Sequence, residues 1–321
     1  MPVRIQSALD AAGIQAARIE HLWWIFFWAC TVVYVVVMAA LIVAVVRGRA
    51  AHVTQPTERR ISGSVAAAMA VSILVLVGFT FASMTTGRAL GFNRELPDRA
   101  NAPDALVVHV TGRQWWWSVE YDNPQPSLRV TSANELHLPV GRPIVLTLRA
   151  ADVIHSFWVP SLHGKVDMIP GRRNVMNLQI DKPGIYRGQC AEYCGLQHAH
   201  MALSVVAESS DDFERWMTGQ RMPAPAPQTD EQQRGLAVFQ QGPCAMCHAV
   251  QGTLAGGRFG PDLTHFATRS TLAAGKLPNT PDALARWLAE PQHVKPGSRM
   301  PPTGLSDEDL RSLLAYLETL K

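Results

Sequence analysis

Side chains with metal-binding chemistry are concentrated in residues 189–201, which read QCAEYCGLQHAHM. This segment supplies two thiols, an imidazole and a thioether, from Cys190, Cys194, His198 and Met201. Soft sulfur ligands at this density favour copper. A further imidazole, His155, follows an apolar strand-like run, and a β-sandwich can bring its loop beside the first. The sequence therefore predicts a copper site built from two loops.

Other metal sites are compatible with the same ligand types. The two cysteines and two histidines could hold a tetrahedral zinc ion, but zinc has no use for Met201. A single blue copper needs one cysteine, whereas a pair of copper ions bridged by both thiolates uses the two that are present. His200 would point to the opposite side of an extended strand from His198, so we do not assign it as a ligand. We favour two copper ions.

A second pair of cysteines lies in the segment CAMCH, residues 244–248. This spacing is the signature of covalent c-type haem attachment. Two thiols bond to the two vinyl groups of the porphyrin, and the adjoining histidine is carried under the iron. We therefore predict haem attachment at Cys244 and Cys247 with His248 as an axial ligand. A zinc site would need a second cysteine or histidine pair at motif spacing, and none follows.

The second axial ligand is predicted to be Met300, in the proline-rich segment SRMPP. Methionine and histidine together raise the haem potential and suit electron transfer. His265 and His293 are rival ligands, which would give a bis-histidine haem. With both axial positions filled, the haem has no room for oxygen, so we expect electron transfer there and no catalysis.

Two apolar stretches, residues 22–46 and 61–87, are uncharged and long enough to cross a hydrocarbon core of about 30 Å. The loop between them, residues 47–60, contains four arginines and one acidic residue, which predicts that it is cytoplasmic. The segment 1–21 and everything after the second span are then outside. A cleaved signal peptide would have a much shorter apolar core of about 7–15 residues, so an uncleaved anchor is favoured.

The rest of the chain divides by composition into a β-rich and a helical part. Residues 103–208 contain short β-branched runs separated by proline and glycine, typical of a β-sandwich or barrel. Residues 209–230 include the proline–alanine segment MPAPAPQ and are expected to be a semi-rigid linker. Residues 231–321 contain helix caps at Thr280 and Ser306 and form the expected haem domain. The net charge of +3 and the 17% charged content indicate no nucleic-acid partner.

The segments DVIHS, VPSL and IPGR, together with the cysteine loop, resemble subunit II of cytochrome c oxidase over about the first 210 residues. The resemblance implies a dinuclear CuA centre. His155 and His198 would be terminal ligands, Cys190 and Cys194 bridging thiolates, and Met201 a weak ligand. Glu192 would bind copper through its backbone carbonyl, and its side chain would reach a magnesium site shared with subunit I.

The segment GRQWWWSVEY resembles the aromatic stretch of the same family, whose first tryptophan is the surface point at which electrons arrive. Trp115 takes that position, as an exposed electron relay or as a contact to the haem domain, and Trp117 is expected in the core. The C-terminal unit resembles a class I cytochrome c domain. Its GPDL segment resembles the family's haem-edge segment, so Pro261 is expected to accept the proton of His248 and orient it.

The fusion of the two units resembles the cytochrome-c-linked type of bacterial oxidase. It implies a multidomain membrane protein with a two-helix transmembrane hairpin, a cupredoxin-like β-sandwich and an all-α class I cytochrome c domain. Electrons would pass from cytochrome c or a cytochrome bc complex through haem c and CuA to haem a of subunit I, where oxygen is reduced to water. The resemblance also implies contact with subunit III, a place in the bacterial inner membrane, and both soluble domains on the periplasmic side.

Two other functions share some of these features. A membrane-tethered electron carrier that feeds a nitric oxide reductase can have the same copper fold and loop. The two-span hairpin and the segment that ends at His155 favour the oxidase. A copper-delivery or metal-sensing protein is a poor match, because the ligand set is buried and saturated.

Overall fold

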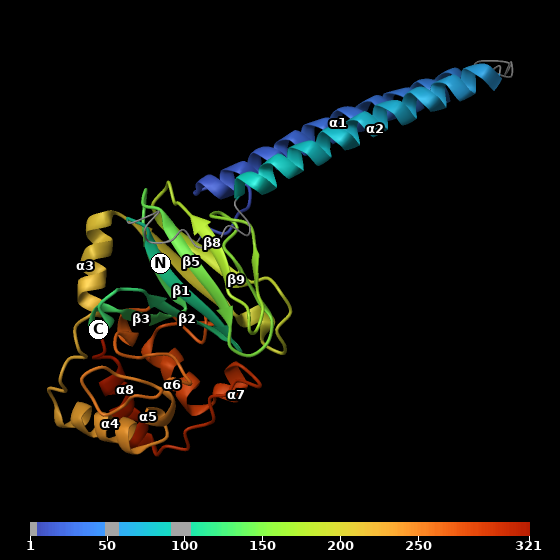
Figure 1. The fold of residues 1–321 in the computed structure, drawn as a ribbon. Coiled ribbons are helices and arrows are strands. Elements are labelled where there is room, and N and C mark those ends of the chain that lie inside the picture. The colour runs from blue at the N-terminus through green and yellow to red at the C-terminus, as the bar shows by residue number, and fades with distance from the viewer. Residues whose placement is uncertain (1–4, 49–57, 91–103) are drawn as a thin grey trace. The chain divides into compact units, whose positions relative to one another are not determined.

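The computed structural model describes residues 5–48, 58–90 and 104–321. The chain divides into two compact units, one formed by Met1–Ala16 with Asn93–Lys321 and the other by Ala17–Phe92. The first contains a β domain and a haem domain, and the second contains two long helices (Figure 1).

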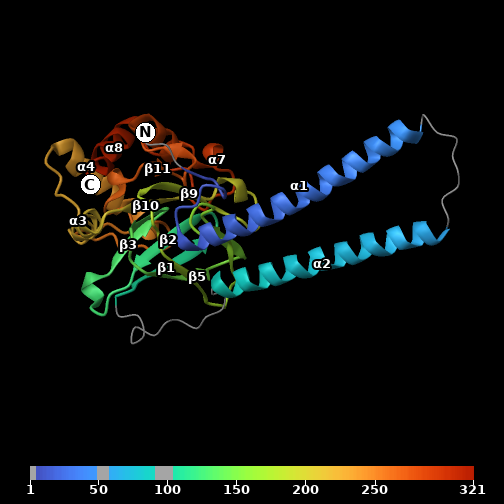
Figure 2. The same cartoon turned by 90° about the horizontal axis from the view of Figure 1, so that it is seen from above.

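The helical unit consists of α1 (Ile14–Gly48) and α2 (Glu58–Leu90). Their most apolar windows have mean hydropathies of 2.9 and 2.4 with none of their residues buried, so both helices can cross a membrane. Arg18 donates to the carbonyl of Ala89, and the rings of Phe26 and Phe79 lie 4.0 Å apart. The helices meet at this end and diverge toward the other (Figure 2). Most of the predicted cytoplasmic loop lies outside the described residues.

The β domain is a sandwich of two five-stranded sheets, in the orders β3-β2-β1-β5-β8 and β4-β10-β9-β6-β7. Side chains alternate between core and surface along β1 and β2, the pattern expected of a half-buried strand. The predicted sandwich is confirmed. The strands are β1 (Leu106–Arg113), β2 (Trp116–Tyr121), β3 (Val130–Ala133), β4 (Glu135–Pro139), β5 (Ile144–Ala150), β6 (His155–Trp158), β7 (Val166–Met168), β8 (Asn174–Leu178), β9 (Gly184–Cys190) and β10 (Ala202–Glu208).

The N-terminal segment is part of this domain, which its sequence did not indicate. Ile5 forms a parallel bridge with Tyr186, and Gly13 forms an antiparallel bridge with Ile180. A Cβ at Gly13 would lie 2.9 Å from the carbonyl oxygens of Gln179 and Leu162, so the close approach requires glycine. The segment that precedes α1 is therefore part of the β domain.

The haem domain contains α4 (Asp230–Gln241), α5 (Cys244–Cys247), α6 (Pro281–Ala289), α7 (Pro291–Val294) and α8 (Asp307–Leu317). It follows α3 (Ser210–Gln220), and its helical class is confirmed, with one addition. A short hairpin, β11 (Thr271–Leu272) with β12 (Leu277–Pro278), interrupts the helices. Helices α4 and α8 approach closely at Gly235, where a Cβ would lie 1.9 Å from the carbonyl oxygen of Ser312.

Candidate functional site

Strand pairing brings the two predicted copper loops together. Phe157 of β6 is paired with Cys190 of β9, so His155 at the start of β6 lies beside the cysteine that ends β9. The chain then passes through a short 3-10 helix, η2 (His198–His200), and returns in β10. His200 lies in this helix, not in the strand we expected. Its ring nitrogens face Gln197 and Lys276, away from the cysteines.

The six groups predicted to bind copper lie within a few ångströms of one another. The sulfurs of Cys190 and Cys194 are 3.7 Å apart, well beyond the S–S bond length of about 2.05 Å. Cys190 Sγ lies 3.8 Å from His155 Nδ1 and 3.2 Å from the Glu192 carbonyl oxygen. Cys194 Sγ lies 3.6 Å from His198 Nδ1 and 3.9 Å from Met201 Sδ. Two sulfurs at the centre with nitrogen, oxygen and thioether donors around them suit soft metal ions.

The two thiols differ in acidity because they are hydrogen-bonded to each other. The interaction between the two thiols lowers the pKa of Cys190 and raises the pKa of Cys194. One thiolate therefore forms readily, while a second negative charge beside it requires a compensating cation. The chemistry of the pair fits a cationic metal centre that both sulfurs share.

Asp152 orients His155, a role that we did not predict. Its carboxylate accepts from the backbone N–H of Gln114 at 2.7 Å and of Val153 at 2.8 Å, and its Oδ1 lies 2.9 Å from His155 Nε2. With Nε2 bonded in this way, Nδ1 faces the sulfurs, and a carboxylate partner is the usual means of orienting a metal-binding histidine. A Cβ at Gly112 would lie 2.9 Å from the His155 ring, so this glycine also shapes the site.

The side chain of Glu192 is partly exposed and pairs with a surface lysine. Its carboxylate lies 3.5 Å from Lys165 Nζ, and the side chain is 44% exposed. In residues 5–48, 58–90 and 104–321, the one group of three or more histidine, cysteine or acidic side chains placed to hold a metal is His155, Cys190 and Cys194.

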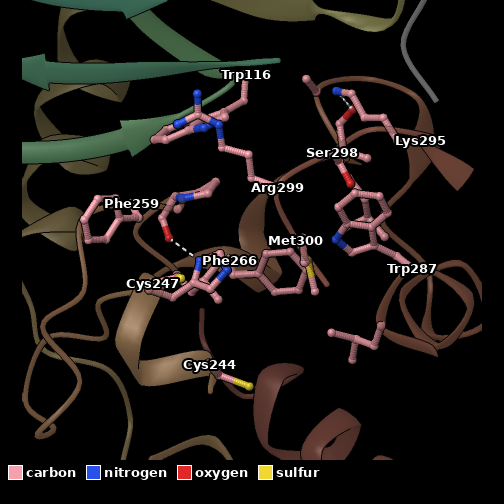
Figure 3. Close-up of a pocket in the computed structure, with 18 of the residues that line it drawn as sticks. Trp116, Cys244, Cys247, Phe259, Phe266, Trp287, Lys295, Ser298, Arg299 and Met300 are labelled. Atoms are coloured by element: carbon pink, nitrogen blue, oxygen red, sulfur yellow. Dashed lines mark hydrogen bonds between the residues drawn. The ribbon is translucent and has the colours of Figure 1, made fainter. Parts of the chain in front are cut away.

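A cavity of about 490 Å³ lies in the haem domain and reaches the β domain, and its wall includes Cys244, Cys247, His248 and Met300 (Figure 3). His248 Nδ1 lies 2.7 Å from the carbonyl oxygen of Pro261, as predicted for an oriented axial histidine. Burial lowers the pKa of His248, which favours the neutral imidazole that binds iron. The cavity lining is otherwise largely apolar, with Phe259, Phe266 and Trp287 among its residues, which fits a porphyrin.

Met300 is better placed than its rivals to be the second axial ligand. It lines the cavity, and its carbonyl accepts from Gln292 Nε2 at 2.9 Å, which fixes the loop. His265 and His293 are not among the lining residues. Both ring nitrogens of His265 lie 3.0 Å from carbonyl oxygens, those of Lys321 and Met222.

Trp115 is buried where the copper loop meets the haem domain, so it is not exposed and instead contacts the haem domain, while its part in electron transfer stays a prediction. The side chain is 9% exposed, and its indole N–H donates to the carbonyl of Cys194 at 3.0 Å. Trp115 also lines the haem cavity. Trp117 is fully buried in the sandwich core, as expected.

The haem domain packs directly on the copper loop. Ala202 N donates to the Ala274 carbonyl at 3.0 Å, and Gln197 Nε2 donates to the Pro296 carbonyl at 2.9 Å. At another edge of the contact, the buried carboxylate of Glu135 accepts from the backbone and hydroxyl of Ser270. The expected linker does not separate the domains, because Met222 and Ala224 bond to the haem domain.

The fold and the two centres define a membrane-anchored electron-transfer protein. Residues 125–209 match the family described as cytochrome c oxidase subunit II, periplasmic domain, and residues 232–321 match the cytochrome c family. The chain is 32% identical to cytochrome c oxidase subunit 2 of Alkalihalophilus pseudofirmus over 318 residues, 98% of this chain and 91% of that protein. It is 33% identical to cytochrome c oxidase subunit 2 of Bacillus subtilis over 231 residues, 68% and 64% of the two chains.

The chain belongs to the cytochrome c oxidase subunit 2 family. It is the subunit through which electrons enter a haem–copper oxidase, and it carries a copper centre and haem c. Membership of the family implies association with other oxidase subunits, and the two long apolar helices fit a membrane protein.

Proposed function

We propose that this chain takes electrons from cytochrome c or a cytochrome bc complex and delivers them to haem a of subunit I, where oxygen is reduced to water. The haem domain receives the electron and the copper loop passes it on. The observation that supports this order is the position of Trp115, which lines the haem cavity and donates a hydrogen bond to Cys194.

The copper loop would hold two copper ions. Cys190 and Cys194 would bridge them, and His155 and His198 would each bind one ion. Met201 and the Glu192 carbonyl would complete the two coordination spheres. A centre of this kind delocalises one electron over two fixed metals, so its ligands move little on reduction. The hydrogen bond from Asp152 and the close approach of Gly112 hold His155 in one orientation.

The cavity of the haem domain would hold one haem c, attached through Cys244 and Cys247. His248 and Met300 would be its axial ligands, with Pro261 orienting His248. The haem supplies one-electron redox chemistry. A methionine ligand raises the potential at which the electron is accepted.

Contacts with other subunits complete the assignment. The Glu192 side chain, which is partly exposed and pairs with Lys165, would share a magnesium ion with subunit I. The helices α1 and α2 would cross a bacterial inner membrane and contact subunits I and III. The β and haem domains would then be on the periplasmic side.

Visible and near-infrared spectra with metal analysis of the detergent-solubilised complex test this proposal. We expect a low-spin haem c spectrum, a delocalised mixed-valence copper signal, and two copper ions per haem c from this chain. One zinc ion, or mononuclear copper alone, would contradict the copper assignment. Copurification with a haem-containing subunit that consumes oxygen is also expected, and copurification with one that reduces nitric oxide would contradict the oxidase assignment.

A further inference from the structure

Lys295 is a buried lysine at the contact between the haem domain and the copper loop. It follows α7 in the haem domain, and 3% of its surface is exposed. Its Nζ donates to the carbonyl of Ala273 at 3.0 Å, within its own domain, and to the carbonyl of Trp115 at 2.6 Å, in the β domain. One ammonium group thus bonds to the backbone of both domains.

Each end of this bridge leads to a redox centre. On the copper side, the indole of Trp115 donates to the carbonyl of Cys194. On the haem side, the backbone carbonyl of Lys295 accepts from Ser298 N at 3.1 Å. Gln292 then ties this loop together, because its Nε2 donates to the carbonyls of both Ser298 and Met300. Lys295 therefore links the backbone of a predicted copper ligand to that of a predicted haem ligand.

Hydrophobic packing does not explain a lysine in this place. Burial of an ammonium group costs several kcal/mol, and a carboxylate partner usually offsets that cost. No ion pair of Lys295 is found among the residues that the structure describes, and burial lowers its pKa to about 7. A methionine of similar length would fill the same space without the desolvation cost. Methionine, however, has no N–H group, so it cannot donate hydrogen bonds to two carbonyls and fix one arrangement of the domains.

We propose that Lys295 is a positioning residue, which fixes the haem domain against Trp115 at the separation needed for electron transfer to the copper loop. The inference rests on the proposed function, because it assumes that the electron passes between these two centres. Lys295 need not touch either cofactor. It acts through Trp115 on one side and the Met300 loop on the other.

The test uses the complete oxidase complex with Lys295→Met and Lys295→Gln. Lys276→Met is the matched control, because Lys276 also bonds across the contact, to His200 at 2.8 Å, but is exposed. Rapid photoreduction of the haem is followed by its absorbance and by the near-infrared copper band. These signals report separately the transfer from haem to copper and the later reoxidation of the copper.

We expect Lys295→Met to slow transfer from haem to copper several-fold, because the two domains can then shift and the electron-tunnelling rate falls steeply as the two centres move apart. Lys295→Gln, whose shorter amide can reach one of the two carbonyls, should be intermediate. Both spectra and the reoxidation of copper should stay as in the wild type, and Lys276→Met should transfer at the wild-type rate.

Two results would overturn the proposal. One is a wild-type rate of haem-to-copper transfer in Lys295→Met with both spectra intact. The other is loss of the copper or haem spectrum in both Lys295 variants, which would assign the residue to folding in general. A wild-type complex without the dinuclear copper signal contradicts the proposed function instead, and this result is known before any variant is made.

Discussion

The carboxylate of Asp152 should contribute to copper affinity although it does not reach the metal site. It accepts three hydrogen bonds, from Gln114 N, Val153 N and His155 Nε2, at 2.7 to 2.9 Å. In Asp152→Asn, one oxygen becomes an NH₂ group that must face at least one of these donors. A lost hydrogen bond to a charged group costs about 1.5–3 kcal/mol. This agrees with the tenfold to hundredfold loss of metal affinity, about 1.4–2.7 kcal/mol, that is typical when such a partner is removed.

Chelator competition on the solubilised complex, followed by the near-infrared copper band, measures this loss. Asp152→Asn should release copper at a tenfold to hundredfold lower chelator concentration than the wild type. Asp167→Asn is the control, because that carboxylate is 48% exposed and pairs with Lys165 on the surface. Equal copper retention in Asp152→Asn and the wild type would show that the hydrogen bond to His155 does not support the site.

Three further predictions concern the haem domain. Met300→Ala should lower the haem potential and let carbon monoxide bind the iron, and an unchanged spectrum would identify a rival histidine as the ligand. Gly260→Ala places a Cβ 2.5 Å from the His248 ring and should lower stability by about 1–3 kcal/mol in thermal unfolding, whereas Gly256→Ala, with open space, should not. Burial lowers the pKa of Lys295 from 10.5 to about 7, despite the opposing influence of Cys194, so the unfolded chain binds more protons between these pH values. The free energy of unfolding should therefore rise from pH 7 toward pH 10, by up to about 5 kcal/mol. A rise of equal size in Lys295→Met would show that the titration of Lys295 is not its cause.

The grouping of the predicted copper ligands could be foreseen because most of them are neighbours in sequence. Cys190, Cys194, His198 and Met201 lie on one loop, so their spacing alone indicates a shared site. His155 was found because a sandwich brings distant loops together, and the pairing of Phe157 with Cys190 does so here. Predicting that these residues lie together requires only their spacing in the sequence and the fold class.

The features that we missed depend on contacts between segments that are far apart in the sequence, and no sequence pattern links those segments. The role of Asp152 requires the Gln114 backbone, and the position of the N-terminal segment requires two bridges to a distant strand. The burial of Trp115 and Lys295 depends on how two domains meet, which the pattern of either domain alone does not contain. The sequence DVIH does contain a signal for Asp152, an acidic residue three positions before a metal-binding histidine.

The direct packing of the haem domain on the copper loop also affects the kinetics of electron transfer between them. A donor that is covalently part of the same chain has no diffusional encounter to complete, so transfer between its two centres is first order and independent of protein concentration. The contacts at this junction are largely buried, where dissolved ions screen little. Added salt should slow the arrival of an outside donor held by surface charge, while the internal step keeps its rate.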